Sequence, residues 1–143
     1  MNKSIAIRCR AVIVVDGKLL VVKHAPDSPF FALPGGHLEW GEDVDECVSR
    51  ELQEELGIKG EVGRLLYVNT FIIEGTQSVE FFFEIENARD YIGIDRSRAS
   101  HASEIGDLRW VSSDDGVDIL PAILNRDLKE GTLLSHEVRF IKE

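Results

Sequence analysis

The sequence predicts a single domain of the α/β class, with strands on both sides of a helix along the chain. Apolar runs rich in Val and Ile alternate with turn residues along much of the chain. Residues 44–56 hold good helix formers, and Gly57 follows them as a C-terminal stop. A chain of 143 residues is long enough to bury a substantial core without a second domain, so we treat residues 1–143 as one unit.

Apolar runs separated by turn residues predict most of the strands. Residues 5–15 and 19–23 flank Asp16-Gly17, a pair typical of a two-residue type I′ turn, and so predict a hairpin. Two more strands are expected within residues 61–73 and 79–85, because Gly75-Thr76 breaks the run between them. On the second of these, we expect Glu80 to be an exposed strand acid.

The C-terminal third begins with a long polar segment. Residues 87–103 lack clear periodicity and predict a loop. A strand is expected at residues 108–111, followed by a terminal helix over residues 119–128 with Pro121 near its start. Residues 138–141 are too few to assign.

The strongest functional signal is the stretch GHLEWGEDVDECVSRELQEELGI, residues 36–58. At about 100° per residue, Glu51, Glu54 and Glu55 project within or beside the apolar stripe of the predicted helix. Desolvated carboxylates without partners are costly, and neighbours at i,i+3 and i,i+4 repel one another. A hard divalent cation such as Mg²⁺ relieves both costs. The alternative, a solvated acidic helix, explains neither this overlap nor the glycines before the helix.

The same residues resemble the signature of the Nudix hydrolases. The matching positions are Gly36, Glu42, Arg50-Glu51-Leu52, Glu54-Glu55, Gly57 and Ile58. The lead-in Leu33-Pro34-Gly35 is similar to that of the family as well. The resemblance implies a Nudix-type α/β/α sandwich with a mixed β-sheet. It also implies a metal-dependent pyrophosphohydrolase that cleaves the diphosphate linkage of a nucleoside diphosphate derivative, with Mg²⁺ or Mn²⁺ as cofactor.

The resemblance assigns roles to individual residues. Glu54 and Glu55 would be metal ligands, and the backbone carbonyl of Gly35 would face a metal. Glu51 would be a ligand or the general base. Arg50 would orient the carboxylates through a salt bridge instead of touching the substrate.

Other candidate residues lie outside the central helix. Glu104 is similarly placed to an acid that reaches the metals in some family members, so Glu51 and Glu104 both remain candidates for the general base. Arg96 and Arg98, close to His101, gather positive charge that suits phosphate binding, with solvated charges as the alternative. Phe31 and Trp40 are candidates to contact the substrate, with packing in the core as the alternative.

Composition restricts the partners. A net charge of −10 lacks the basic footprint of a nucleic-acid-binding protein, so we expect a small nucleotide substrate and no stable nucleic acid complex. No stretch approaches the roughly 18 apolar residues of a membrane span, and Arg8 and Arg10 interrupt the first apolar run. We therefore expect a cytoplasmic protein, compatible with either a monomer or a homodimer. Cys9 and Cys47 lack zinc-ligand spacing and are expected in the core.

A sensor that binds a nucleotide-like ligand without hydrolysing it is the alternative function on a Nudix fold. Carboxylates lining a pocket for an anion would weaken binding, so the complete acidic set favours metal-dependent catalysis. The sequence does not choose among nucleoside triphosphates, ADP-ribose and nucleotide sugars as substrates.

Overall fold

Two β-sheets form the framework of the computed structural model, which describes residues 2–95, 97 and 99–141. The larger sheet has five strands in the order β4-β1-β6-β5-β8. Its strands are β1 (Ser4–Val12), β4 (Gly35–His37), β5 (Val62–Ile73), β6 (Thr76–Ile85) and β8 (Arg139–Ile141). The sheet is mixed, because β1 runs parallel to β6 and antiparallel to β4, while β5 runs antiparallel to β6.

The smaller sheet contains β2 (Val14–Val15), β3 (Lys18–Lys23) and β7 (Asp107–Val111) in that order. The predicted hairpin is confirmed, since β2 and β3 pair antiparallel around Asp16 and Gly17. Both turn residues have positive φ, 50° and 77°, as a type I′ turn requires. The predicted strand before the terminal helix is confirmed as β7.

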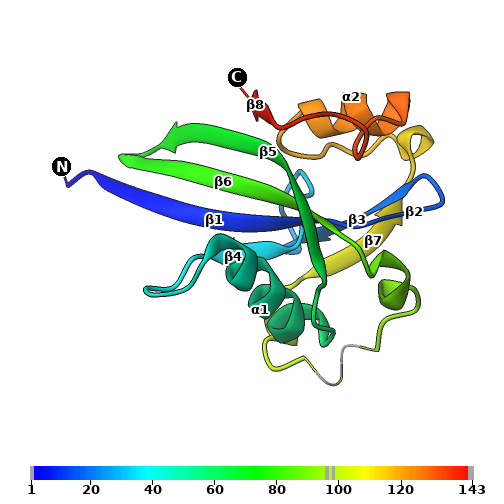
Figure 1. The fold of residues 1–143 in the computed structure, drawn as a ribbon, viewed down its shortest axis with the longest axis horizontal. Helices are drawn as coiled ribbons and strands as arrows, with labels where there is room; N and C mark the ends of the chain where they lie inside the picture. The colour runs from blue at the N-terminus through cyan, green and yellow to red at the C-terminus, as the bar shows by residue number, and fades with distance from the viewer. Residues whose placement is uncertain (1, 96, 98, 142–143) are drawn as a thin grey trace.

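Helices α1 (Val44–Leu56) and α2 (Ile123–Glu130) lie on opposite sides of the larger sheet (Figure 1). The ends of α1 match the prediction: the Glu46 side chain accepts a hydrogen bond from the Asp43 backbone N–H, and Gly57 adopts φ 81° at the C-cap. Short 3₁₀ helices occur at η1 (Ala88–Tyr91), η3 (Ala102–Glu104) and η4 (Ser113–Asp115). In the described part of the chain, no helix has the length and apolar character to cross a membrane.

The terminal helix begins later than predicted. Instead of starting at Ile119, α2 starts at Ile123. The reason is a long-range pairing, because the Leu120 N–H donates to the Phe31 carbonyl and the Phe31 N–H donates to the Asp118 carbonyl. These bonds hold the preceding segment extended.

Two apolar cores occupy the two faces of the larger sheet. The core on the α1 side includes Cys9, Cys47 and Phe83, and the core on the α2 side includes Tyr67 and Phe82. Consecutive residues of β6 thus enter different cores, as the alternation of a strand requires. Both cysteines are fully buried and unpaired, as expected from the sequence.

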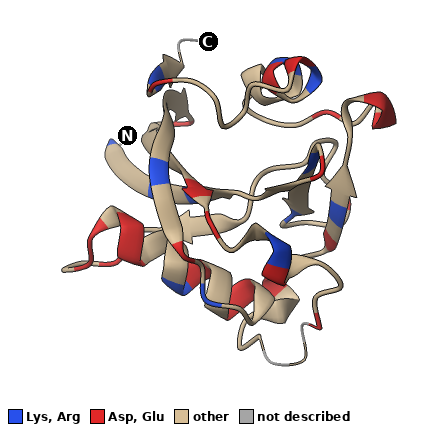
Figure 2. Cartoon of the chain, turned by 45° about the vertical axis from the view of Figure 1, so that its right-hand side comes forward, with Lys and Arg blue, Asp and Glu red and all other residues tan. Residues whose placement is uncertain are grey.

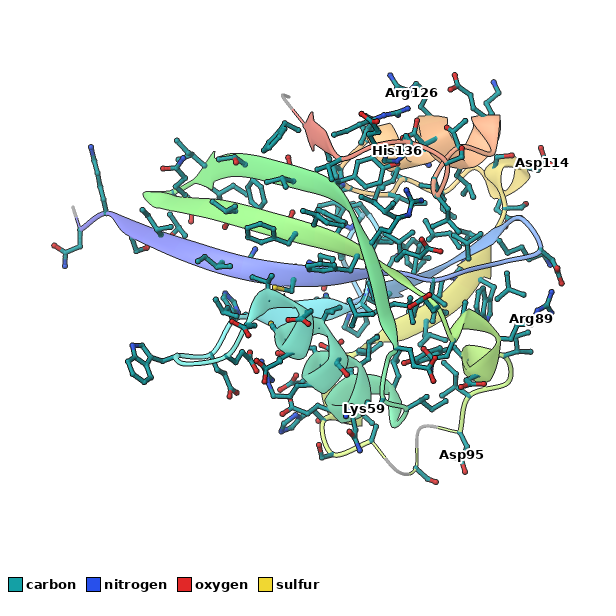
Figure 3. The ribbon with its side chains drawn as sticks, viewed as in Figure 1. Lys59, Arg89, Asp95, Asp114, Arg126 and His136 are labelled. Atoms are coloured by element: carbon teal, nitrogen blue, oxygen red, sulfur yellow. The ribbon has the colours of Figure 1, made fainter. Side chains whose placement is uncertain are left out.

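A buried acid ties α2 to the sheet. Asp127 has no exposed surface, accepts a hydrogen bond from the Tyr67 hydroxyl, and lies 2.9 Å from Nη1 of Arg139. Figure 3 shows Arg126 and His136 on the same side of the sheet as α2. Burial opposes ionisation of Asp127, but the Tyr67 hydrogen bond and the two arginines together hold its pKa below the ordinary value.

We expect Asp127→Asn to lower the free energy of unfolding by about 2 kcal/mol near neutral pH, because it removes a buried negative charge that is hydrogen-bonded to Arg139 and to the Tyr67 hydroxyl. A depressed folded-state pKa contributes stability above the unfolded pKa of about 4, and this contribution is lost as pH falls through the folded value. The difference between wild type and variant in denaturant melts should therefore shrink in acid. Asp114→Asn, at an exposed position of η4, is the control and should change little. A difference independent of pH would contradict a role for the Asp127 charge.

Candidate active site

Two glycines of β4 bring the backbone against α1. Gly35 has φ 145°, and a Cβ added there would lie 1.9 Å from the Cys9 carbonyl oxygen. A Cβ on Gly36 would lie 2.6 Å from the carboxyl carbon of Glu51. Glycine is therefore required at position 35 by both its φ and its contact with β1, whereas a side chain at position 36 would displace the Glu51 carboxylate.

Three of the acids of α1 gather beside these glycines. Glu55 and Glu51 are buried, with 2% and 9% of their surfaces exposed, and Glu54 is partly exposed. The Gly35 N–H donates to Oε2 of Glu55 at 3.4 Å. Burial raises the pKa of Glu51, and the neighbouring Glu55 raises it further. Figure 2 shows acidic positions repeated along α1. The crowding expected from the sequence is thus present.

Arg50 is the cation among these acids. It donates to Glu42 at 2.9 and 2.8 Å, to Glu51 at 3.1 Å, to Glu54 at 3.0 Å and to the His37 carbonyl at 3.0 Å. The Arg50 hydrogen bonds, as the largest cause, lower the pKa of Glu42 to about 2. A single guanidinium therefore fixes the positions of three carboxylates relative to β4.

The acids and glycines line a cavity of about 590 Å³, which we call the acidic cleft. Its lining consists of Arg8, Arg10, His24, Gly35, Gly36, His37, Glu39, Arg50, Glu51, Glu54, Glu55, His101 and Glu104. A cavity of about 660 Å³ lies on the other flank of α1, but its lining lacks Glu51, Glu55 and both glycines of β4. We therefore place the chemistry in the acidic cleft, despite the slightly larger volume of the other cavity.

Arg8 and Arg10 were missed by the sequence interpretation as functional residues. The sequence feature that could have revealed them is their i,i+2 spacing on an otherwise apolar strand. This spacing places both side chains on one face of β1. Arg8 Nε donates to His37 Nε2 at 3.3 Å, and Arg10 Nε donates to Glu80 Oε2 at 3.0 Å. Arg10 is paired with Glu80, so Arg8 supplies most of the positive charge on this side of the acidic cleft.

Of the other predicted site residues that the structure describes, one lines the acidic cleft and two lie outside it. Phe31 lies outside the lining of the acidic cleft: it is 4% exposed and packs in the α2-side core, with Lys23 Nζ 4.7 Å from its ring centroid. Trp40 is fully exposed on the loop between β4 and α1, outside the lining of the acidic cleft as the described residues define it. Glu104 is exposed in η3 and lines the cleft. Arg96 and Arg98 lie outside the described residues.

A third cavity, of about 350 Å³, adjoins the acidic cleft and shares Arg8 and Arg10 with it. The remaining lining is Phe30, Ala32, Asn69, Phe71, Ile73, Glu80, Leu120 and Pro121. Glu80 is buried, contrary to the expectation from the sequence, because Arg10 and the Asn69 amide at 3.2 Å compensate its charge. We call this cavity the apolar pocket.

The donor set of the acidic cleft suits a divalent cation. Within residues 2–95, 97 and 99–141, no three carboxylate, imidazole or thiol groups already surround a common centre, since Glu51 and Glu54 turn toward Arg50. Two observations nevertheless fit a metal. Three carboxylates share one small region, and Nδ1 of His101 is buried there without a hydrogen-bond partner. Oxygen donors of this kind are those that Mg²⁺ and Mn²⁺ prefer.

A mixed sheet between two helices, with an acidic helix packed on a glycine strand, defines the Nudix type of α/β/α fold. The family model described as the NUDIX domain matches residues 6–130. The chain belongs to the NUDIX family, as the resemblance of residues 36–58 indicated.

Two curated relatives illustrate the range of the family. The chain is 31% identical over 106 residues to phosphatase NudJ of Escherichia coli K12, covering 73% of this chain and 66% of that protein. It is 44% identical over 66 residues to the ADP-ribose pyrophosphatase of Methanocaldococcus jannaschii, covering 44% of this chain and 38% of that protein. The chain thus spans less than two thirds of either relative.

Solved structures agree with the fold. The MutT NUDIX hydrolase of Burkholderia pseudomallei is 30% identical with a TM-score of 0.67, covering 87% of this chain and 96% of that one. A UDP-X diphosphatase is 25% identical with a TM-score of 0.69, covering 95% and 66% respectively. The predicted fold class, α/β with a mixed sheet, is therefore confirmed.

Proposed function

We propose that this protein is a metal-dependent pyrophosphohydrolase that cleaves the diphosphate linkage of a nucleoside diphosphate derivative. The observation that carries the proposal is the acidic cleft, in which Glu51, Glu54 and Glu55 crowd against glycine backbone opposite Arg8 and Arg10. Acids alone would repel a phosphate, so this combination is best explained by a cation bound between protein and substrate.

Each group in the cleft has a role in this proposal. Glu54, Glu55 and the Gly35 carbonyl would hold Mg²⁺ or Mn²⁺, and Glu51 would be either a further ligand or the general base. When bound, the metal polarises the phosphate oxygens and neutralises the charge that develops on them. Arg50 keeps the three carboxylates in place through its hydrogen bonds to Glu51 and Glu54.

The proton of the attacking water needs an acceptor. Glu51 suits this role because its burial raises its pKa toward the working pH, where a general base is most effective. Glu104 at the exposed rim of the cleft is the alternative acceptor.

The organic part of the substrate is proposed to lie in the apolar pocket. Arg8 and Arg10 line both cavities, so a diphosphate held beside them would direct its attached group past β1. Phe71, Ile73 and Leu120 then offer apolar surface to a planar ring, while Asn69 and Glu80 offer polar atoms to its edge.

Phe71→Ala should raise KM about tenfold and change kcat little, because loss of an aromatic contact to a base costs about 1–3 kcal/mol of binding. The control is Ile72→Ala, the next residue of β5, which is exposed and lines a different cavity. Steady-state kinetics on the best substrate would check this. Equal KM values for both variants would contradict placement of the organic group in this pocket.

The function is tested by a substrate panel of ADP-ribose, nucleoside triphosphates, nucleotide sugars and dinucleoside polyphosphates, with Mg²⁺ or Mn²⁺. We expect release of a nucleoside monophosphate from at least one of them, abolished by EDTA. Binding of a nucleotide without any product would instead support the alternative of a Nudix-fold sensor.

A further inference from the structure

We propose that His101 supplies a nitrogen ligand to the metal of the acidic cleft, in addition to the carboxylates of α1. The inference rests on the proposed function, since it concerns the same metal. It adds a side chain from the segment between β6 and β7 to ligands that otherwise come from β4 and α1.

The first observation is an unsatisfied nitrogen. Nδ1 of His101 is buried and lacks a hydrogen-bond partner, although the rest of the side chain keeps 45% of its surface exposed. It lies 3.1 Å from Oε2 of Glu54, but the pair does not have the geometry of a hydrogen bond. A buried polar atom without a partner is costly. A cation bound to both atoms would satisfy the nitrogen and the carboxylate together.

The second observation is how firmly the backbone places this ring. The His101 N–H donates to the Glu54 carbonyl at 2.7 Å. That carbonyl lies in the last turn of α1, where carbonyls lack partners within the helix. The Glu104 N–H in turn donates to the His101 carbonyl at 3.0 Å. These main-chain bonds fix the His101 backbone relative to α1, so that the imidazole stays within reach of the Glu54 carboxylate.

The other histidines of the cleft are less suited to bind the metal. His37 Nε2 already accepts a hydrogen bond from Arg8 Nε. His24 Nε2 lies 3.6 Å from Glu55 Oε1, farther than His101 lies from Glu54, and neither of its nitrogens is buried without a partner. Glu104 is exposed and would supply oxygen. Among these residues, His101 alone combines an unused buried nitrogen with a carboxylate neighbour in the described chain.

A nitrogen ligand has a consequence for metal choice. Both Mg²⁺ and Mn²⁺ prefer oxygen donors, but Mn²⁺, as a transition metal, accepts an imidazole nitrogen more readily than Mg²⁺ does. The wild-type protein should therefore prefer Mn²⁺, and His101→Ala should weaken Mn²⁺ binding about tenfold while changing Mg²⁺ binding much less.

Pulsed electron paramagnetic resonance of Mn²⁺ bound to the full chain tests the ligand directly, because ¹⁴N in the coordination shell modulates the echo. We expect this modulation in wild type, its loss in His101→Ala, and its retention in the matched controls His24→Ala and His37→Ala. His101→Asn, which keeps a polar side chain before η3, should also lose it. Circular dichroism of each variant verifies folding.

The outcomes separate this inference from the proposed function. Mn²⁺ bound by wild type without ¹⁴N modulation would overturn the His101 ligand and leave the pyrophosphohydrolase intact. Modulation that survives in His101→Ala but disappears in His24→Ala would overturn it as well. Absence of any Mn²⁺ binding by wild type would overturn both.

Discussion

Replacing Glu51 by Gln should reduce kcat/KM roughly a thousandfold, because charge stabilisation at the phosphates depends on correctly placed metal and base. The same substitution should leave the metal-free protein at least as stable as wild type. Gln retains an oxygen that can accept the hydrogen bond from Arg50 Nη1. It also removes a charge from a buried position.

The sign of the stability effect follows from the raised pKa of Glu51. A group whose pKa is raised on folding contributes stability below its unfolded pKa and loses that contribution as pH rises through the folded value. Near neutral pH the ionised Glu51 carboxylate therefore lowers the free energy of unfolding, and Gln removes this destabilisation.

Denaturant melts in EDTA, combined with kinetics on the panel substrate, would measure both effects of Glu51→Gln. Asp45→Asn removes one exposed charge from the same helix and should leave turnover unchanged. A folded Glu51→Gln protein with near-normal turnover would remove Glu51 from the site.

Arg50→Gln is expected to give the largest loss of stability, about 3 kcal/mol, because it leaves Glu42, Glu51 and Glu54 without their common cation. Saturating Mg²⁺ or Mn²⁺ should restore part of this loss, since a bound cation supplies the missing positive charge. Binding to the native state alone adds about 2.7 kcal/mol at a hundredfold excess over Kd. Turnover should fall as well, because the carboxylates lose their fixed positions.

The pH dependence provides a second readout for Arg50→Gln. The depressed pKa of Glu42, about 2, contributes stability above its unfolded value and loses it as pH falls toward 2. The gap between wild type and variant should therefore narrow in acid. Arg89→Gln, which breaks an exposed pair with Asp16, is the control and should cost about 1 kcal/mol or less. Equal stability of the Arg50 and Arg89 variants would refute the arrangement of charges around Arg50.

Much of the central helix could be predicted because its signals are local. The capping residues, the Gly57 stop and the overlap of acids with the apolar stripe all lie within one short segment. Phe31 could not be assigned in this way. Neighbouring side chains on an extended segment point in opposite directions, and nothing local tells which of Phe30 and Phe31 meets the core.

The burial of Glu80 and the residue at which α2 begins both depend on residues that are distant in sequence. Glu80 is buried because β1 lies parallel to β6 and presents Arg10 to its carboxylate. The start of α2 is set by bonds from Leu120 to Phe31. Strand order and register determine these contacts, and a single sequence does not reveal them.

The shared wall formed by Arg8 and Arg10 has a consequence for how the sequence of this protein can diversify. Among the described residues, these two are the lining common to the acidic cleft and the apolar pocket. Apart from these two arginines, the pocket is built by β5, β6 and the segments beside Ala32 and Leu120. None of these elements contributes a described residue to the acidic cleft. Under the proposed function, mutations of Phe71, Ile73 or Leu120 can therefore reshape the pocket without disturbing the acids, so that substrate choice can change while the cleavage site is kept.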